Sequence, residues 1–282
     1  MALGPGISFE FFPPRTAEQR QVLEATTGKL AELAPEYLSV TFGAGGSALN
    51  STLETVAGLI ATAGVPVAPH VSCMAPSLDS LRRQLDQYRS IGVRRLVVLR
   101  GDRPRDNICS GPFRFANELV SWIRQEFGSA FHIDVACYPE VHPESASAES
   151  ELRHFRQKVG AGADGAITQY FFNADSYFRF IDDAADLGVN VPITPGVMPI
   201  TSYGQLARFS RMCGAEIPRW IRRRLESYAD DIESLREFGM EVLTSLCDRL
   251  LNGGAPGLHV YTLNRSHASW RLWHNLAGHF AH

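Results

Sequence analysis

The chain alternates short apolar runs with longer amphipathic segments along its whole length. The apolar runs have strand length and cover Ile7–Phe11, Tyr37–Thr41, Val67–Ser72, Arg95–Leu99, Ile133–Tyr138, Ala166–Tyr170, Val191–Pro195 and Leu258–Thr262. Several of them are continuously apolar, which is typical of parallel strands buried on both faces. Segments with helical spacing lie between them, at Ala17–Leu33, Leu53–Ala63, Leu78–Ile91, Phe115–Phe127, Ala148–Ala161, Ala174–Leu187 and Tyr203–Cys213. The last crossover, about Ile217 to Leu251, should hold one long helix or two.

Eight strand–helix units in 282 residues predict an α/β fold of the (β/α)8 TIM-barrel type. The alternative is a doubly wound open sheet. Because no Pro/Gly/Ser-rich linker interrupts the alternation, we expect a single catalytic domain over residues 1–282.

Composition excludes several classes of protein. The net charge of −3 gives no electrostatic reason to expect nucleic acid or an anionic membrane as a partner. The five cysteines form no Cys-x-x-Cys pair, which argues against a disulfide framework and against a zinc site. No apolar stretch approaches the roughly 20 residues of a membrane span. The first six residues lack the basic and apolar regions of a signal peptide, so we expect a cytoplasmic protein.

Polar side chains follow nearly every predicted strand, at the end where a barrel of this type carries its chemistry. They are Glu10, Thr41, His70, Arg100 with Asp102, Tyr138 with His142, Gln169, and Thr262 with Asn264 and Arg265. Taken singly, His70 and His142 are better explained as satisfied core histidines, whereas a loop ion pair explains Arg100 with Asp102 only as well as a functional role does. Their joint occurrence at one end of the barrel favours a functional site.

Glu10 is the most informative of these residues because it lies inside an apolar strand. A closed barrel has no edge strand on which a carboxylate could face solvent, and an unpaired inward carboxylate costs several kcal/mol. Burial would raise the pKa of Glu10, which is what a general acid requires. We therefore expect Glu10 to be catalytic.

The same residues resemble the methylenetetrahydrofolate reductase family over nearly the whole chain, from Ser8 to about Asn275. Eight motifs occur in the family's order: Ser8–Arg15, Ser39–Ala44, Ala68–His70, Leu99–Asp102, Tyr138–Pro143, Ala166–Gln169, Pro195–Gly196 and Tyr261–Arg265. Each motif alone is modest evidence, and the ordered set is specific.

The resemblance implies an enzyme of one-carbon metabolism and methionine biosynthesis, with FAD bound at the carboxyl ends of the strands. NAD(P)H would give hydride to the flavin and leave, and 5,10-methylenetetrahydrofolate would then be reduced to 5-methyltetrahydrofolate. By the family's motifs, Glu10 and Asp102 are catalytic. The flavin-contacting positions are Thr41, His70, Leu99, Arg100, Gly101, Asp102, Ala116, Tyr138, His142, Lys158 and Ile167. The substrate-contacting positions are Glu10, Asp102, Gln169, Gln205, Phe209 and Arg265. We also expect a homo-oligomer.

The implied roles agree with the chemistry. The imidazolidine ring of the folate must open to an iminium ion, which requires a proton on the departing amine, the role implied for Glu10. A fixed carboxylate such as Asp102 would stabilise the cationic iminium.

Two alternatives stay open: a flavin-independent reductase that passes hydride directly from NADH to the folate, and a barrel methyltransferase that uses a pterin. A non-catalytic folate- or flavin-binding module is a third, against which intact Glu10 and Asp102 argue.

Overall fold

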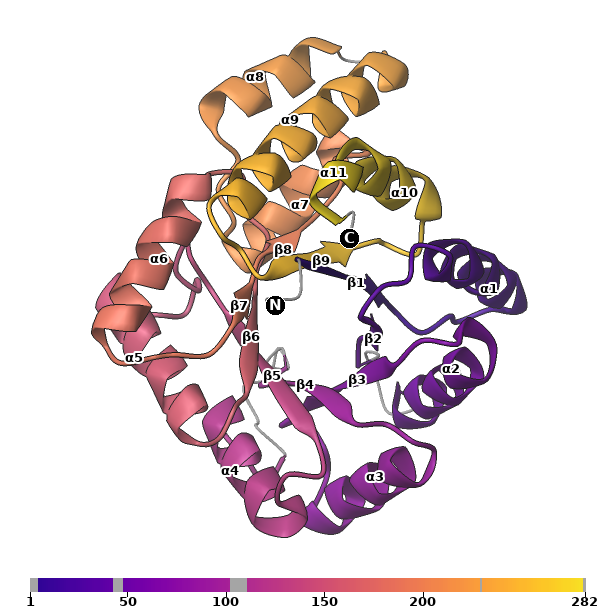
Figure 1. Ribbon diagram of the computed structural model, residues 1–282, viewed down its shortest axis with the longest axis vertical. Helices are drawn as coiled ribbons and strands as arrows, with labels where there is room; N and C mark the ends of the chain where they lie inside the picture. Colours follow the sequence, from indigo (N-terminus) through magenta and orange to yellow (C-terminus); the bar gives the residue numbers. More distant parts are fainter. Residues whose placement is uncertain (1–4, 43–47, 102–110, 229, 281–282) are drawn as a thin grey trace.

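The parallel strands form one sheet rolled into a nearly closed barrel, with the helices outside it (Figure 1). The computed structural model describes residues 5–42, 48–101, 111–228 and 230–280. The strands are β1 Gly6–Phe11, β2 Tyr37–Val40, β3 Val67–Ser72, β4 Arg95–Leu99, β5 His132–Cys137, β6 Gly165–Thr168, β7 Ile193–Thr194, β8 Gly196–Val197 and β9 Gly257–Tyr261. The helices are α1 Ala17–Ala31, α2 Ala48–Ala63, α3 Leu78–Ser90, α4 Ala116–Phe127, α5 Ala148–Gly160, α6 Ala174–Asp186, α7 Tyr203–Cys213, α8 Arg219–Tyr228, α9 Ile232–Asn252, α10 Ser266–Asn275 and α11 Ala277–Phe280.

The predicted barrel is confirmed, and the open-sheet alternative is wrong. The seventh predicted strand, Val191–Pro195, contains β7, and Pro195, which has no N–H to give to a sheet ladder, separates β7 from a second short strand, β8. β7 pairs with β6 and β8 pairs with β9, so this kinked segment joins the two ends of the sheet. The carbonyl of Pro195 accepts a hydrogen bond from the backbone N–H of His259 at 3.0 Å. The proline therefore bends the strand without opening the barrel.

The last crossover contains two helices, α8 and α9, which extend beyond the ring of the other helices (Figure 1). The helix boundaries follow local sequence signals. Asp79 and Asp175 lie in the first turns of α3 and α6, as expected from the helix dipole. Gly92, Gly162 and Gly188 adopt positive φ just after the ends of α3, α5 and α6.

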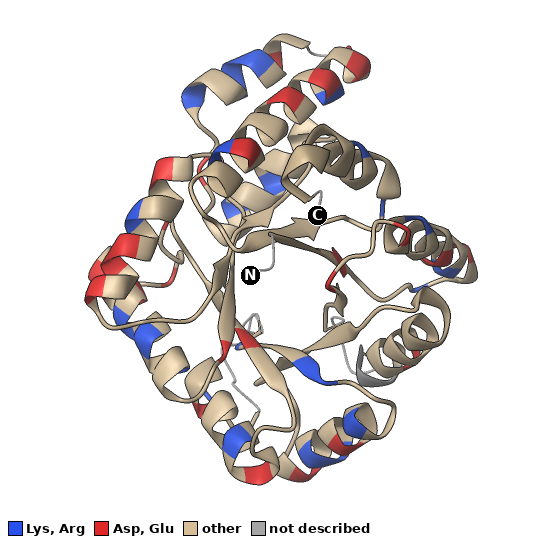
Figure 2. Cartoon of the chain, in the orientation of Figure 1, with Lys and Arg blue, Asp and Glu red and all other residues tan. Residues whose placement is uncertain are grey.

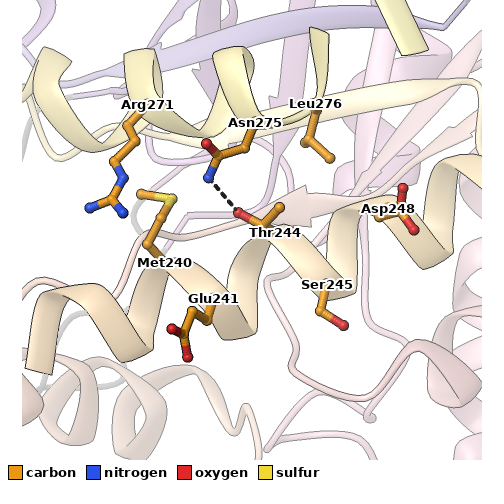
Figure 3. Close-up of a pocket in the computed structure, with 8 residues that line it drawn as sticks. All are labelled: Met240, Glu241, Thr244, Ser245, Asp248, Arg271, Asn275 and Leu276. Carbon is orange, nitrogen blue, oxygen red and sulfur yellow. Dashed lines mark hydrogen bonds between the residues drawn. The ribbon is translucent and has the colours of Figure 1, made fainter. Parts of the chain in front are cut away.

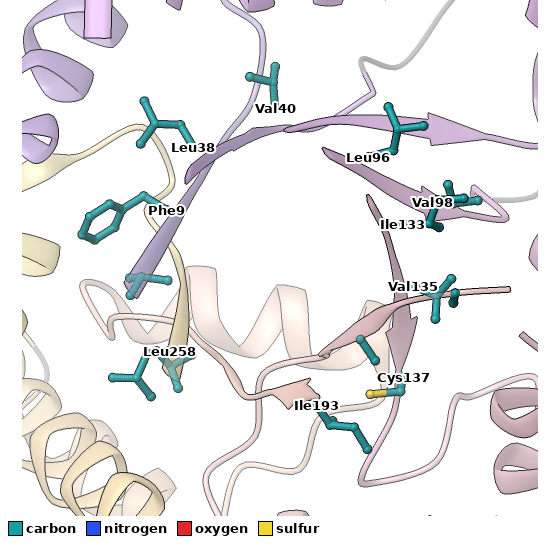
Figure 4. Packing of buried hydrophobic residues seen from close by; sticks show 14 of the residues in the cluster. Phe9, Leu38, Val40, Leu96, Val98, Ile133, Val135, Cys137, Ile193 and Leu258 are labelled. Atoms are coloured by element: carbon teal, nitrogen blue, oxygen red, sulfur yellow. The ribbon is translucent and has the colours of Figure 1, made fainter. Parts of the chain in front are cut away.

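The main hydrophobic core lies between the strands and the helices. Strand side chains such as Phe9, Leu38 and Val98 are fully buried and point outward from the ring (Figure 4). The barrel interior has a smaller apolar cluster of Tyr37, Ala68, Val97 and Ile167. Charged side chains concentrate on the surrounding helices (Figure 2). Inward-facing polar side chains on the strands therefore stand out from the rest of the barrel.

An ion network lies at one end of the barrel, at the starts of β4 and β5. The Arg95 guanidinium Nε lies 2.8 Å from the buried carboxylate of Asp134, and His132 Nε2 lies 3.2 Å from the same carboxylate. The Arg95 guanidinium also covers the Tyr37 ring at 4.3 Å. These contacts therefore place charged and aromatic side chains at the amino-terminal end of the barrel, opposite the end where Glu10 lies.

Candidate active site

Glu10 points into the barrel near the carboxyl end of β1, between two histidines from other strands. Its Oε2 atom lies 3.3 Å from His70 Nε2 of β3 and 3.4 Å from His259 Nε2 of β9. The side chain of Glu10 is 18% exposed, whereas those of His70 and His259 are 7% and 0% exposed. Alternation along β1 explains this placement, because Phe9 and Phe11 on either side are buried toward the helices.

His259 connects Glu10 to two buried hydroxyl groups. Its Nδ1 lies 2.7 Å from Ser8 Oγ, and its Nε2 lies 3.4 Å from Ser39 Oγ. Ser8 and His259 are directly paired in the β1–β9 register, which fixes the short contact. Because an ionised carboxylate only accepts hydrogen bonds, the Nε2 atom that faces ionised Glu10 must carry the proton. Glu10, His259 and Ser8 then form a continuous path for hydrogen bonds inside the barrel.

Burial raises the pKa of Glu10, but the electrostatic attraction of His70 and the hydrogen bond and charge of His259 lower it to about 2. The expectation that burial would leave this pKa raised is therefore wrong. That expectation treated the carboxyl group as isolated, and the barrel supplies two imidazoles from β3 and β9. Before a ligand binds, Glu10 is therefore ionised at neutral pH.

His70 has hydrogen-bonding capacity that the described residues do not use. Its buried Nε2 is close enough to Glu10 for electrostatic attraction, at 3.3 Å, but no described group is aligned to form a hydrogen bond with it. Buried polar atoms are almost always hydrogen-bonded in folded proteins. An orphaned imidazole nitrogen beside a carboxylate therefore indicates a place where a ligand contributes the missing partner.

A second group of predicted residues lies in the loops after β4 and β5. Arg100 Nη1 pairs with Glu144 at 2.7 Å, and His142 Nδ1 accepts a hydrogen bond from the Glu144 backbone at 3.0 Å. The Tyr138 ring meets the His142 ring edge-on, with centroids 4.7 Å apart. Between them Val141 has a φ of 68°, an unfavourable value for a β-branched residue that marks a tightly determined turn. The loop ion pair of Arg100 therefore joins two strand ends.

The turn after β9 is fixed to the end of β1. The Thr262 hydroxyl donates to the Glu10 carbonyl at 2.6 Å. The Asn264 side chain bonds both the N–H and the carbonyl of Phe12, at 3.0 and 2.9 Å. Leu263 and Asn264 both have positive φ, so the chain turns sharply before Arg265. Thr262 and Asn264 thus have positioning roles, and they hold Glu10 and Arg265 at the same end of the barrel.

Gln205 and Arg265, 60 positions apart in the chain, line one pocket near the start of α7. Phe209 lies on the same helix, half-buried against a cluster that includes Tyr170 and Phe172. Gln169 follows β6, and its backbone N–H donates to the Cys137 carbonyl at 2.8 Å. The structure therefore brings these predicted substrate positions to the carboxyl-terminal end of the barrel.

The remaining predicted positions are more dispersed. Thr41 and Gly101 follow β2 and β4, Leu99 ends β4, and Ile167 is buried inside β6. Ala116 is the first residue of α4. Lys158 lies on α5, where its ammonium group donates to the Ala136 carbonyl of β5 and its pKa is lowered, chiefly by burial. Asp102 lies outside the described residues.

Three functional candidates were missed by the sequence interpretation: His259, Ser8 and Ser39. A usable signal existed for His259, since it is a polar residue within an apolar strand, as Glu10 is in β1. Because alternate strand residues face the barrel interior, His259 could have been placed there from its position in this strand.

A surface groove of about 420 Å³ between α9 and α10 contains none of the predicted residues (Figure 3). Asn275 donates to Thr244 across it at 3.0 Å.

Within the described ranges, no helix has both the length and the apolar character needed to cross a membrane.

Comparison with known proteins identifies the family of this chain. The family model described as methylenetetrahydrofolate reductase matches residues 4–277. The 5,10-methylenetetrahydrofolate reductase of Escherichia coli is 37% identical over 270 residues, covering 96% of this chain and 90% of the relative. Methylenetetrahydrofolate reductase (NADH) 1 of Arabidopsis thaliana is 35% identical, and the match covers 91% of this chain but 46% of that longer protein.

Solved structures of low sequence identity share the fold. A Clostridium thermocellum protein described as binding two copies of 5-methyl-5,6,7,8-tetrahydrofolic acid has a TM-score of 0.65, 15% identity, and coverage of 99% of this chain and 96% of that one. Dihydropteroate synthase from Xanthomonas albilineans has a TM-score of 0.53 at 14% identity, covering 98% and 94% of the two chains. These structures show the fold alone, whereas the sequence matches show the family: this chain belongs to the methylenetetrahydrofolate reductase family.

Proposed function

We propose that this protein reduces 5,10-methylenetetrahydrofolate to 5-methyltetrahydrofolate, with hydride from NAD(P)H passed through bound FAD in two half-reactions. Family membership supports the overall reaction. The single observation that carries the mechanism is Glu10, a nearly buried carboxylate held between His70 and His259 at the carboxyl end of the barrel.

The described residues fit a flavin at this end of the barrel. His70 offers a buried nitrogen without a hydrogen-bond partner, and a heteroaromatic ring rich in carbonyl and nitrogen groups would satisfy it. Arg100, oriented by Glu144, presents a permanent positive charge beside the Tyr138–His142 turn. Bound FAD would supply a two-electron carrier that accepts hydride from NAD(P)H and delivers it to the folate.

Glu10 and the residues beside it would supply the proton that opens the imidazolidine ring. With its pKa lowered to about 2, Glu10 is ionised at neutral pH before a ligand binds, so it must receive a proton before it can act as the acid. A folate amine placed against Glu10 would draw that proton through the carboxyl group as the carbon–nitrogen bond breaks. His259, backed by Ser8 at 2.7 Å, is placed to replace it. In this proposal a neighbouring histidine, when protonated, passes a proton to Glu10, and Glu10 delivers it to the departing amine.

The iminium ion that results is cationic and needs a stabilising negative charge. The family's motif assigns this role to Asp102, outside the described residues, and assigns Gln169 a folate contact. An anionic side chain fixed before the reaction would lower the barrier without reorganising.

One spectroscopic experiment tests this proposal against its alternatives. Purified protein should show flavin absorbance, lose it when NADH is added anaerobically, and recover it when methylenetetrahydrofolate follows. Colourless protein that still oxidises NADH with folate would support the flavin-independent reductase. Methyl transfer without NADH consumption would support the pterin methyltransferase, and tight binding without turnover would support a binding module.

A further inference from the structure

The turn after β5 contains a carboxylate that the proposed function does not use. Glu140 lies between Tyr138 and His142 in sequence, the two residues whose rings meet edge-on. Its Oε2 atom accepts a hydrogen bond from the backbone N–H of Glu216 at 2.7 Å. Glu216 lies 76 positions further along the chain, shortly after the end of α7. This bond therefore joins α7 to the turn that carries two of the predicted flavin positions.

The same two segments also pack closely beside this bond. Gly214, which follows the last residue of α7, has a φ of 77°, and a Cβ atom placed on it would lie 2.7 Å from Cγ of Pro143. Glycine allows both the left-handed backbone and the close approach. Ala215, between Gly214 and Glu216, is buried. The segment after α7 is thus held against the turn by a packing contact and by a charge-assisted hydrogen bond.

Glu140 is half-buried, which is costly for a carboxylate. Burial raises its pKa, the hydrogen bond from the Glu216 backbone lowers it, and the negative charge of Glu216 raises it. The ionised group therefore lies beside a like charge and is stabilised by a backbone N–H. A side chain kept under these conditions contributes mainly through the acceptor that it offers to that N–H.

The turn after β5 is also fixed by contacts that do not involve Glu140. The Glu144 backbone donates a hydrogen bond to His142 at 3.0 Å, and the Ser145 hydroxyl donates to Glu151 of α5 at 2.6 Å. Removing the Glu140 carboxylate should therefore leave the turn in place. The element that it releases is the carboxyl end of α7.

α7 carries two of the positions that the family's motifs assign to the substrate, Gln205 and Phe209. The turn after β5 carries two of the positions assigned to the flavin, Tyr138 and His142. The placement of α7 relative to this turn therefore determines how the substrate positions face the flavin positions.

We propose that Glu140 is a positioning residue, which fixes the carboxyl end of α7 to the turn after β5 and so holds Gln205 and Phe209 in place relative to the flavin. The inference rests on the proposed function. Glu140 acts through the backbone N–H of Glu216 and not by touching the substrate. An acceptor atom is all that this link needs, so Gln should replace Glu140 and Ala should not.

The test measures kcat and KM for methylenetetrahydrofolate, together with flavin content, in the parent and three variants. Glu140→Ala removes the acceptor, whereas Glu140→Gln keeps one. Glu216→Gln is the matched control, because it changes an exposed side chain and leaves the backbone N–H in place.

A hydrogen bond to a charged group changes an equilibrium by about tenfold or more. Since Ser210 of α7 also lies 3.0 Å from the Tyr170 hydroxyl, α7 should shift without leaving the barrel. In Glu140→Ala we expect KM to rise about five- to tenfold, with kcat within about threefold of the parent and flavin content unchanged. Glu140→Gln and Glu216→Gln should resemble the parent.

Amide hydrogen exchange over residues 203–216 measures the link without turnover. We expect exchange at the end of α7 to be about tenfold faster in Glu140→Ala than in the other three proteins. Gly214→Ala tests the same link from the other side, because its Cβ atom would meet Pro143 while Glu140 stays intact. It should also raise KM and speed exchange.

Each contrary result has a distinct meaning. Unchanged exchange in Glu140→Ala would contradict the link, and faster exchange with unchanged KM would reduce Glu140 to a structural residue. A raised KM in Glu140→Gln would assign the effect to charge and overturn the inference. If the parent does not reduce methylenetetrahydrofolate, the proposed function fails. Affinity for 5-methyltetrahydrofolate then decides: weaker binding by Glu140→Ala alone supports the positioning role, and equal binding by all four proteins contradicts it.

Discussion

Replacing His259 with Gln tests whether the buried imidazole supplies the proton that Glu10 delivers. Gln retains a polar side chain of similar reach but has no titratable nitrogen. The variant removes the 3.4 Å contact with Glu10 and the 2.7 Å contact with Ser8. Since His259 lowers the pKa of Glu10 through both a hydrogen bond and its charge, its loss should let burial raise that pKa.

The size of the effect follows from these contacts. One of the two imidazoles remains, so we expect the pKa of Glu10 to rise by about one unit or more. Loss of a buried hydrogen-bond partner should lower the free energy of unfolding by about 1–3 kcal/mol. Because His259 acts through Glu10, folate reduction should slow by roughly ten- to a hundredfold, at the lower end of the range for acid catalysis.

Stopped-flow measurement of each half-reaction between pH 5 and 9 separates these effects. We expect flavin reduction by NADH to stay within about threefold of the parent, and the pH profile of folate-dependent reoxidation to move. His132→Gln is the control, since His132 belongs to the ion network at the opposite end of the barrel. Equal slowing of both half-reactions, or an unshifted pH profile, would refute a role for His259 in proton supply.

Three further predictions concern neighbouring groups. Arg100→Ala should reduce the flavin content of purified protein while flavin-saturated enzyme keeps most of its folate chemistry, and unchanged flavin content would contradict the placement of Arg100. Asp102→Asn should slow folate-dependent reoxidation by on the order of a hundredfold or more and flavin reduction much less, so equal slowing of both would exclude selective action on the iminium ion. The pKa of Glu10 is lowered from 4.5 to about 2, so its pairing stabilises the fold above pH 4.5 and is lost as the pH falls toward 2. Urea unfolding should show the stability of the parent relative to Glu10→Gln falling by on the order of 3 kcal/mol across that window, and a constant difference would contradict the pairing.

Most of the fold could be predicted from the sequence because strand periodicity and helix signals act locally. Val67–Ser72 and Tyr203–Cys213 have the predicted bounds. The second short strand after Pro195, β8, was not predicted, although Pro195 ends the predicted strand. A proline ends one ladder locally, but whether the chain resumes pairing with β9 depends on barrel closure, a long-range property.

The location of the candidate site could be predicted from the sequence, but the ionisation of its residues could not. Glu10 stood out because a carboxylate in an apolar strand has few structural explanations. Its lowered pKa could not be predicted, because it depends on His70 and His259, which lie 60 and 249 positions away in sequence and meet only in the closed barrel. Likewise, the pocket shared by Arg208 and Arg265 exists only once α7 and the turn after β9 are packed together.

The most direct test of the account is the reoxidation of reduced Glu10→Gln enzyme by methylenetetrahydrofolate. Gln keeps the size of Glu10 but cannot deliver a proton, and general acid catalysis contributes roughly a hundredfold to ten-thousandfold. We predict near-normal bleaching of the flavin by NADH, retained folate binding, and reoxidation slowed by at least about a hundredfold. Reoxidation at close to the parent rate would show that Glu10 is not the acid, and the proton path through His259 would then have no role.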